Sequence, residues 1–187
     1  VNIFNPDTIS NVVRNAGVVE IAGLELEVLA SLTPNIQVGL DWGSTFPKFV
    51  EFNSFDASGN TIDLKNEANF PYTPKHKVHG HVTYEFPRFD FGNLRARVDW
   101  TYQDSITFLL PKPELNSADS FNLWNARLTL DEMQGPGDTT MRIALWGKNL
   151  TDESYFNNGV NIYNGLGLDI NTFGDPRTWG VDFEIQL

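Results

Sequence analysis

The sequence predicts an all-β protein, in which a single antiparallel, up-and-down sheet crosses a membrane as part of a β-barrel. Apolar and polar residues alternate with period two along most of the chain, which is the pattern of a strand with two different faces. Several alternating runs approach the roughly 9–11 residues that a tilted strand needs to cross a bilayer, whereas soluble strands most often have about 5–6. The connections between the runs alternate between short and long, as they do in outer-membrane barrels.

Alternating segments recur along the chain and predict about seven strands. They span residues 24–32, 36–43, 78–86, 94–103, 124–130, 141–148 and 178–187. The last is the clearest, because every second residue from Trp179 to Leu187 is apolar and the residues between them are polar or small. Successive side chains of a strand point to opposite faces, so each segment would have an apolar and a polar face. Leu29 and Trp146 interrupt the pattern.

The connections predict how the strands are joined. Short links span residues 33–35, 88–92 and 131–138, and long tracts span residues 46–74, 105–116 and 151–175. In an up-and-down sheet, this order places all the short links at one end and all the long tracts at the other. A soluble sandwich also has one wet face per sheet, so alternation alone leaves that class open.

Composition excludes several classes of function. The chain of 187 residues carries 24 Asp and Glu against 13 Lys and Arg, a net charge of −11, which argues against nucleic-acid binding. It contains no cysteine, which removes disulfides, thiol catalysis and cysteine-bound zinc. Aromatic residues make up 13% of the chain, more than a disordered acidic segment would hold. No uncharged apolar run reaches the roughly 18 residues of a transmembrane helix.

Four stretches resemble a known family when they are taken together and in order. They are NAG at 15–17 followed by GLELE at 23–27, PKH at 74–76, LWGKNLTD at 145–152 followed by YF at 155–156, and GDPRTWG at 174–180. These motifs resemble those of the TonB-dependent outer-membrane receptors. The resemblance implies a 22-stranded barrel that encloses an N-terminal plug. Residues 1–187 would then form the C-terminal third of that barrel, with the plug and the earlier strands outside this chain.

The resemblance also implies a function. The whole receptor would transport a scarce ligand actively across the bacterial outer membrane, most often a ferric siderophore or another iron complex. Its partners would be the lipid bilayer, the small ligand, and TonB through an N-terminal region absent from this chain. No nucleic acid, cofactor, bound metal or enzymatic step is implied. The acidic, Asn-rich and aromatic loops would equally suit a saccharide or other solute.

The long tracts supply the candidate ligand-contact residues. Loops as long as 46–74 and 151–175 are usually functional or disordered. Both of these tracts hold aromatic side chains beside Asn and Asp, which suits a partly polar ligand. The candidates are Phe52, Phe55, Phe70 and Tyr72 in the first tract and Tyr155, Phe156, Tyr163 and Phe173 in the last. The alternative is that these loops only shield the surface.

The polar faces supply the candidate lumen-facing residues, which are His79, His81, Arg95 and Arg97. Two histidines at i and i+2 of a strand project the same way and could chelate a metal, but a polar wall that tolerates histidine explains them better. The arginines, with Arg127, could bind an anion or form ion pairs with the acidic residues of the wall. Glu25 and Glu27 share a face and cannot flank a substrate, so a solvated wall suits them better than catalysis.

Two other interpretations stay open. The first is a soluble all-β carbohydrate-binding module, in which exposed Trp and Phe would stack on sugars. The second is a small self-contained barrel, against which the odd number of strands counts.

Overall fold

The computed structural model describes residues 2–5, 10–13, 17–55, 61–66, 68–108, 117–161 and 168–186. The strands are β1 (Asn2–Asn5), β2 (Ser10–Val13), β3 (Gly17–Thr33), β4 (Ile36–Phe55), β5 (Thr61–Asp63), β6 (His76–Glu85), β7 (Asn93–Gln103), β8 (Ile106–Thr107), β9 (Ser117–Ala118), β10 (Phe121–Gln134), β11 (Thr140–Lys148), β12 (Phe156–Asn161), β13 (Asp169–Phe173) and β14 (Thr178–Gln186). No helix among the described residues is both long and apolar enough to span a membrane.

The main sheet is an antiparallel meander. Its strand order is β14-β11-β10-β7-β6-β4-β3, so each of these strands pairs with the main strand that precedes it in the chain. The short β5 adds to the far end of β4. The two remaining small hairpins, β12-β13 and β8-β9, belong to the connections, and β1-β2 precedes the sheet. The seven strands predicted from alternation are therefore confirmed.

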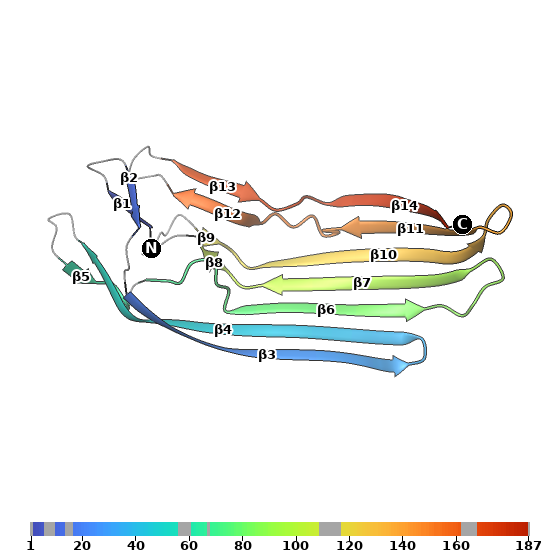
Figure 1. Cartoon of the computed structure of the whole chain (residues 1–187), viewed down its shortest axis with the longest axis horizontal. Helices are drawn as coiled ribbons and strands as arrows, with labels where there is room; N and C mark the ends of the chain where they lie inside the picture. Colours follow the sequence, from blue (N-terminus) through green and yellow to red (C-terminus); the bar gives the residue numbers. More distant parts are fainter. Residues whose placement is uncertain are drawn as a thin grey trace.

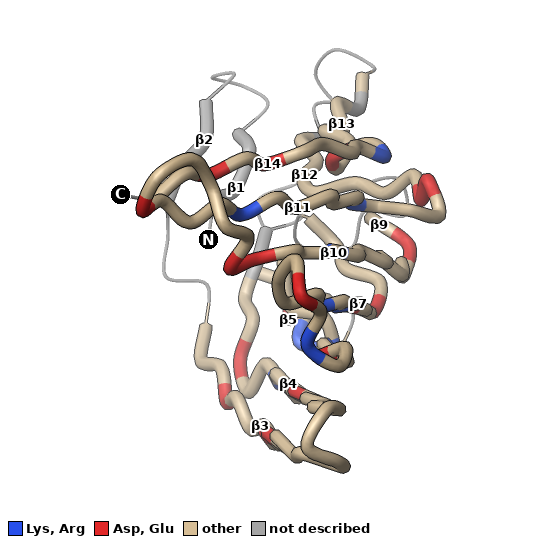
Figure 2. The backbone as a smooth tube through the Cα atoms, turned by 90° about the vertical axis from the view of Figure 1, so that its right-hand side faces the viewer, with Lys and Arg blue, Asp and Glu red and all other residues tan. Residues whose placement is uncertain are grey.

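The connections sort to opposite ends of the sheet, as predicted. The turns between β3 and β4, β6 and β7, and β10 and β11 lie together at what we call the short-turn end (Figure 1). The tracts between β4 and β6, β7 and β10, and β11 and β14 lie at the opposite, long-loop end (Figure 1). Seen from the short-turn end, the strands from β14 to β3 follow one another as a single layer (Figure 2).

The strand register separates an apolar face from a polar face. Val82 pairs with Val38 on one side and Val98 on the other, and the next row joins Thr83 to Gln37 and Arg97. Many large side chains of the apolar face remain exposed. Eight of them are exposed by 39% to 59%: Val28, Leu40, Val82, Val98, Leu128, Leu145, Val181 and Phe183. A sandwich would bury this face under a second sheet. The described residues place no second sheet there, which argues against the soluble alternative.

Aromatic residues gather near the long-loop end of the apolar face. Trp100 and Trp124 are cross-strand partners with ring centroids 6.1 Å apart, and Trp42 lies in the next row toward the loops. Trp100 packs over Gly80, where an added Cβ would meet the indole at 3.6 Å. Such a grouping is typical of an aromatic girdle, because Trp prefers the boundary between apolar and polar surroundings.

Two departures from the prediction concern strand limits. β4 continues to Phe55, so the first long connection begins about a third of the way into the predicted tract 46–74. Proline has no backbone N–H to donate to a neighbouring strand. Pro47 is tolerated in β4 because β6 pairs with β4 only as far as Ser44, so no strand next to Pro47 on that edge requires the N–H. The last long connection contains the β12-β13 hairpin, whose Asn-rich sequence carries no clear alternation.

Candidate functional site

The polar face forms a wall of charged and polar side chains, which we call the polar wall. Its members include Glu27, Gln37, Asp41, His79, His81, Thr83, Arg95, Arg97, Asp99, Arg127, Arg142, Asp182 and Glu184. Trp146 also lies on this wall, which explains why it interrupts the apolar alternation. Its indole Nε1–H donates to Asp182 Oδ1 at 3.0 Å, so the ring satisfies its one polar atom there.

Each arginine of the polar wall lies against a carboxylate. Arg97 Nη2 lies 2.7 Å from Asp99 Oδ1 and Arg127 Nη2 lies 2.8 Å from Asp182 Oδ2. Arg95 spans two strands, because its guanidinium lies 3.2 Å from Asp131 and 3.6 Å from Glu85. Arg142 pairs with Glu184 at 3.1 Å. Each arginine of the wall thus has a carboxylate partner, which favours ion pairs over a binding patch for an anionic ligand.

The predicted lumen-facing histidines lie side by side on β6. His79 Nδ1 is 3.2 Å from Asp41 Oδ2 and its Nε2 is 3.4 Å from Asp99 Oδ1, so the imidazole bridges the two neighbouring strands. The His81 ring, 5.9 Å from that of His79, covers Gly39, where a Cβ would overlap it. Among the described residues, no three His, Asp or Glu side chains are arranged to hold a metal ion.

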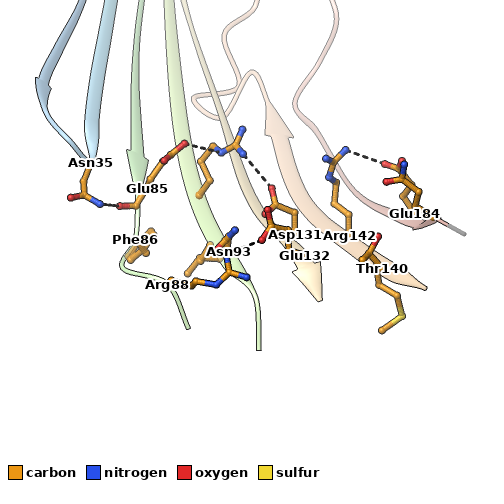
Figure 3. A pocket seen from close by; sticks show the side chains of 14 residues that line it. Asn35, Glu85, Phe86, Arg88, Asn93, Asp131, Glu132, Thr140, Arg142 and Glu184 are labelled. Carbon is orange, nitrogen blue, oxygen red and sulfur yellow. Dashed lines mark hydrogen bonds and ion pairs between the residues drawn. The ribbon is translucent and has the colours of Figure 1, made fainter. Parts of the chain in front are cut away.

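A concave region of about 600 Å³ lies at the short-turn end of the polar wall. Figure 3 shows its charged lining, where Arg142 pairs with Glu184 on the neighbouring strand. Arg95 also lines this region and pairs with Glu85 on one side and Asp131 on the other. Asn35 closes one side by donating from Nδ2 to the Glu85 carbonyl at 2.9 Å. The region is polar and open, and its charged side chains already form ion pairs with one another. It therefore suits contact with another polar surface better than capture of a small apolar molecule.

At the long-loop end, the first connection has a small core of its own. Phe52, which is only 3% exposed, packs against Phe49 with ring centroids 4.8 Å apart, and Phe70 packs on Phe49 at 5.6 Å. The Lys65 backbone N–H donates to the Asp63 carboxylate at 3.0 Å, and this hydrogen bond lowers the pKa of Asp63. The buried rings hold the loop in place.

The second and third connections share another small core. Ile106, Phe108 and Ala118 are almost fully buried, and Phe156 of β12 packs against them. Phe156 also contacts its cross-strand partner Phe173, with centroids 4.8 Å apart, and Phe173 is 64% exposed.

The predicted ligand-contact residues therefore occupy different environments. Phe52 is buried, while Phe70 and Phe156 are half-buried in the two small cores. Tyr155, also half-buried, packs against Phe121 with ring centroids 4.4 Å apart and covers Gly174.

Two of the predicted contacts present large surfaces, Tyr72 with 51% exposure and Phe173 with 64%. Phe55 ends β4, opposite Thr61. Tyr163 lies outside the described residues.

The sequence did not single out Asn149 as an organising residue. It is 4% exposed and has a φ of 49°, and its amide Nδ2 donates to the carbonyls of Glu153 at 2.9 Å and Asp175 at 3.0 Å. Its Oδ1 accepts the Glu153 N–H at 2.8 Å. This side chain ties the end of β11 to the start of β14, so the stretch around Lys148 to Asp152 has a structural role.

The structure also joins Ser44 and His76, which are far apart in sequence. Ser44 Oγ donates to the Lys75 carbonyl at 3.0 Å and lies 3.0 Å from His76 Nδ1. Because its single proton goes to a carbonyl, the serine is held as a structural link and is not activated as a nucleophile.

Comparison with known proteins places these features in context. Residues 1–150 match the family described as TonB dependent receptor-like, beta-barrel. The chain is similar to the crystal structure of the ferric yersiniabactin uptake receptor FyuA from Yersinia pestis, with 19% identity, a TM-score of 0.68, and coverage of 90% of this chain and 24% of that one. It is also similar to the siderophore receptor PiuA from Acinetobacter baumannii, with 16% identity, a TM-score of 0.66, and coverage of 89% and 22%. No curated protein matches the sequence. The chain thus spans about a quarter of the length of either receptor.

Proposed function

The chain belongs to the TonB-dependent receptor family, as part of its β-barrel, and from this premise we propose that it serves the uptake of a ferric siderophore or similar small ligand across the bacterial outer membrane. In this proposal, residues 1–187 are the C-terminal portion of a 22-stranded barrel. The remaining strands, the plug and the region that meets TonB lie elsewhere in the receptor. The observation that carries the proposal is a single sheet with one exposed apolar face and one polar face whose arginines are paired with carboxylates.

The two faces support distinct roles. The apolar face, many of whose large side chains are exposed, suits contact with lipid, because hydrocarbon accepts apolar side chains without the cost that water imposes. The polar wall suits a lumen, since its arginines and carboxylates already pair with one another. The concave region between Asn35 and Glu184 would contact the plug, as a polar surface that needs few new hydrogen bonds.

Ligand capture is assigned to the long-loop end. Tyr72 and Phe173 offer exposed aromatic surface, and the buried rings of Phe52 and Phe108 support the loops beneath them. An aromatic face provides flat apolar contact at little conformational cost, and neighbouring Asn side chains provide hydrogen bonds. Phe52, Phe70 and Phe156 would then act as supports for the contact surface.

The hairpin β12-β13 allows a clean test. Because Phe156 and Phe173 are cross-strand partners, residues 157–172 of the full-length receptor can be replaced by a two-residue turn. Tyr72→Ala and Phe173→Ala in the same variant remove the two exposed rings. Growth would be measured under iron limitation, with each member of a panel of purified ferric siderophores as the sole iron source. We expect the intact receptor to support growth on at least one, and the shortened receptor to lose that growth while its barrel still inserts.

A matched change at the other end provides the control. Replacing Pro136 to Asp138 in the β10-β11 turn by Gly-Ser should leave growth unchanged. Growth that persists after the hairpin is removed would contradict the assignment to the long-loop end. If the intact receptor supports growth on no siderophore of the panel, the iron proposal is wrong, and a saccharide panel would follow.

A further inference from the structure

Tyr72 touches all three long connections. It belongs to the first, between β4 and β6, and its backbone N–H donates to the Thr107 carbonyl of β8 at 2.9 Å. Its ring packs on Phe108 with centroids 5.5 Å apart, and its hydroxyl donates to Asn158 Oδ1 of β12. One residue thus contacts two segments that lie 35 and 86 residues further along the chain.

The backbone of Tyr72 indicates that this position is held by its contacts. Its φ is 55°, in the left-handed region that bulky residues rarely adopt. Such a strained conformation persists only where the surrounding contacts impose it. Because half of the Tyr72 side chain is exposed, burial alone does not explain why this backbone conformation is kept. We attribute it to the contacts with Thr107, Phe108 and Asn158.

Phe108 forms the second part of the link. It is 1% exposed, the most deeply buried large side chain among the described residues. On one side it meets Tyr72, and on the other it belongs to the cluster with Ile106 and Ala118 that Phe156 of β12 covers. Phe108 is therefore placed between the first connection and the third.

We propose that Tyr72 and Phe108 lock the three long connections into one body, so that the first and third move together through β8-β9 and do not open separately. Packed aromatic contacts of this kind transmit displacement because a tightly packed core tolerates few arrangements. A ligand that contacts the exposed half of Tyr72 or Phe173 would then displace or stabilise all three connections together. The use of this coupling in ligand capture rests on the proposed function, whereas the coupling itself does not.

Amide hydrogen exchange of the full-length receptor in detergent, without added ligand, tests the coupling. The Phe108→Ala variant should exchange faster in residues 68–75 and 156–161 as well as around β8-β9, while the short-turn end stays unchanged. Tyr72→Phe removes only the hydroxyl. It should accelerate exchange in residues 156–161 by about 2- to 12-fold, the factor that one net hydrogen bond corresponds to.

Val160→Ala provides the matched control, because Val160 lies on the same strand as Asn158 and is 48% exposed. This change should leave exchange in residues 68–75 at the wild-type rate. Faster exchange confined to residues 105–118 in Phe108→Ala would overturn the proposal. If that variant does not fold, Tyr72→Phe decides alone, and wild-type exchange in residues 156–161 would overturn it. Since no ligand is present, either failure leaves the transport proposal standing.

Discussion

Replacing Asn149 by alanine should destabilise the barrel more than any exposed loop substitution nearby. The change removes three side-chain hydrogen bonds, to the carbonyls of Glu153 and Asp175 and from the Glu153 N–H. At a net contribution of about 1 kcal/mol each, their loss costs roughly 3 kcal/mol. Alanine must also adopt the φ of 49° that asparagine tolerates, which adds about 1–2 kcal/mol. The expected loss in the free energy of unfolding is about 4–5 kcal/mol.

The two terms can be separated by a second variant. Asn149→Gly loses the same hydrogen bonds but accepts the left-handed backbone without strain, so it should be less destabilised than Asn149→Ala. Thr151→Ala, at an exposed position two residues on, serves as the control. Urea-induced unfolding of the full-length receptor from phospholipid vesicles would give all three values. If the free energies of unfolding of Asn149→Ala and Thr151→Ala differ by less than about 1 kcal/mol, the hydrogen bonds of Asn149 do not stabilise this junction.

Two further predictions concern the sheet and use the same unfolding assay. Val98→Arg, on the apolar face, should lower the free energy of unfolding by about 2–4 kcal/mol. Gln37→Arg, in the next row of the polar wall, should lower it by less than about 1 kcal/mol. Equal losses would show that the assignment of the two faces is wrong. Gly39→Ala would place a Cβ inside the His81 ring and should cost about 1–3 kcal/mol relative to Gly43→Ala, where nothing lies within 4 Å. Adding His81→Ala should restore most of that loss, and an unchanged cost in the double variant would disprove the clash.

The sheet could be predicted from the sequence because its faces differ in polarity. Period-two alternation located all seven main strands, and the order of short and long links fixed their ends. The extension of β4 to Phe55 was missed because the local sequence around Pro47 reads as a loop. The segment is a strand because it pairs with β3, and Pro47 is tolerated because β6 does not pair with it there. Strands β8 and β9, of two residues each, are too short to show a period.

The loop residues were harder to assign. Aromatic residues beside Asn and Asp suit either a ligand surface or a small core, and composition does not separate the two. Phe52 turned out to lie in such a core, whereas Tyr72 remains half exposed. The roles of Asn149, Ser44 and Tyr72 depend on partners at long sequence distances, which no local pattern reveals.

The order of the strands in the sheet has a consequence for assembly. Because each main strand pairs with the one before it in the chain, every pairing can form by closing one local hairpin, and none requires distant segments to meet first. The long closure between β11 and β14 is shortened by the β12-β13 hairpin, which can form within it. Strands can therefore be added one at a time at a growing edge, with only two edges unpaired at any stage. A polypeptide delivered gradually to a membrane could fold by this route without first completing its circumference.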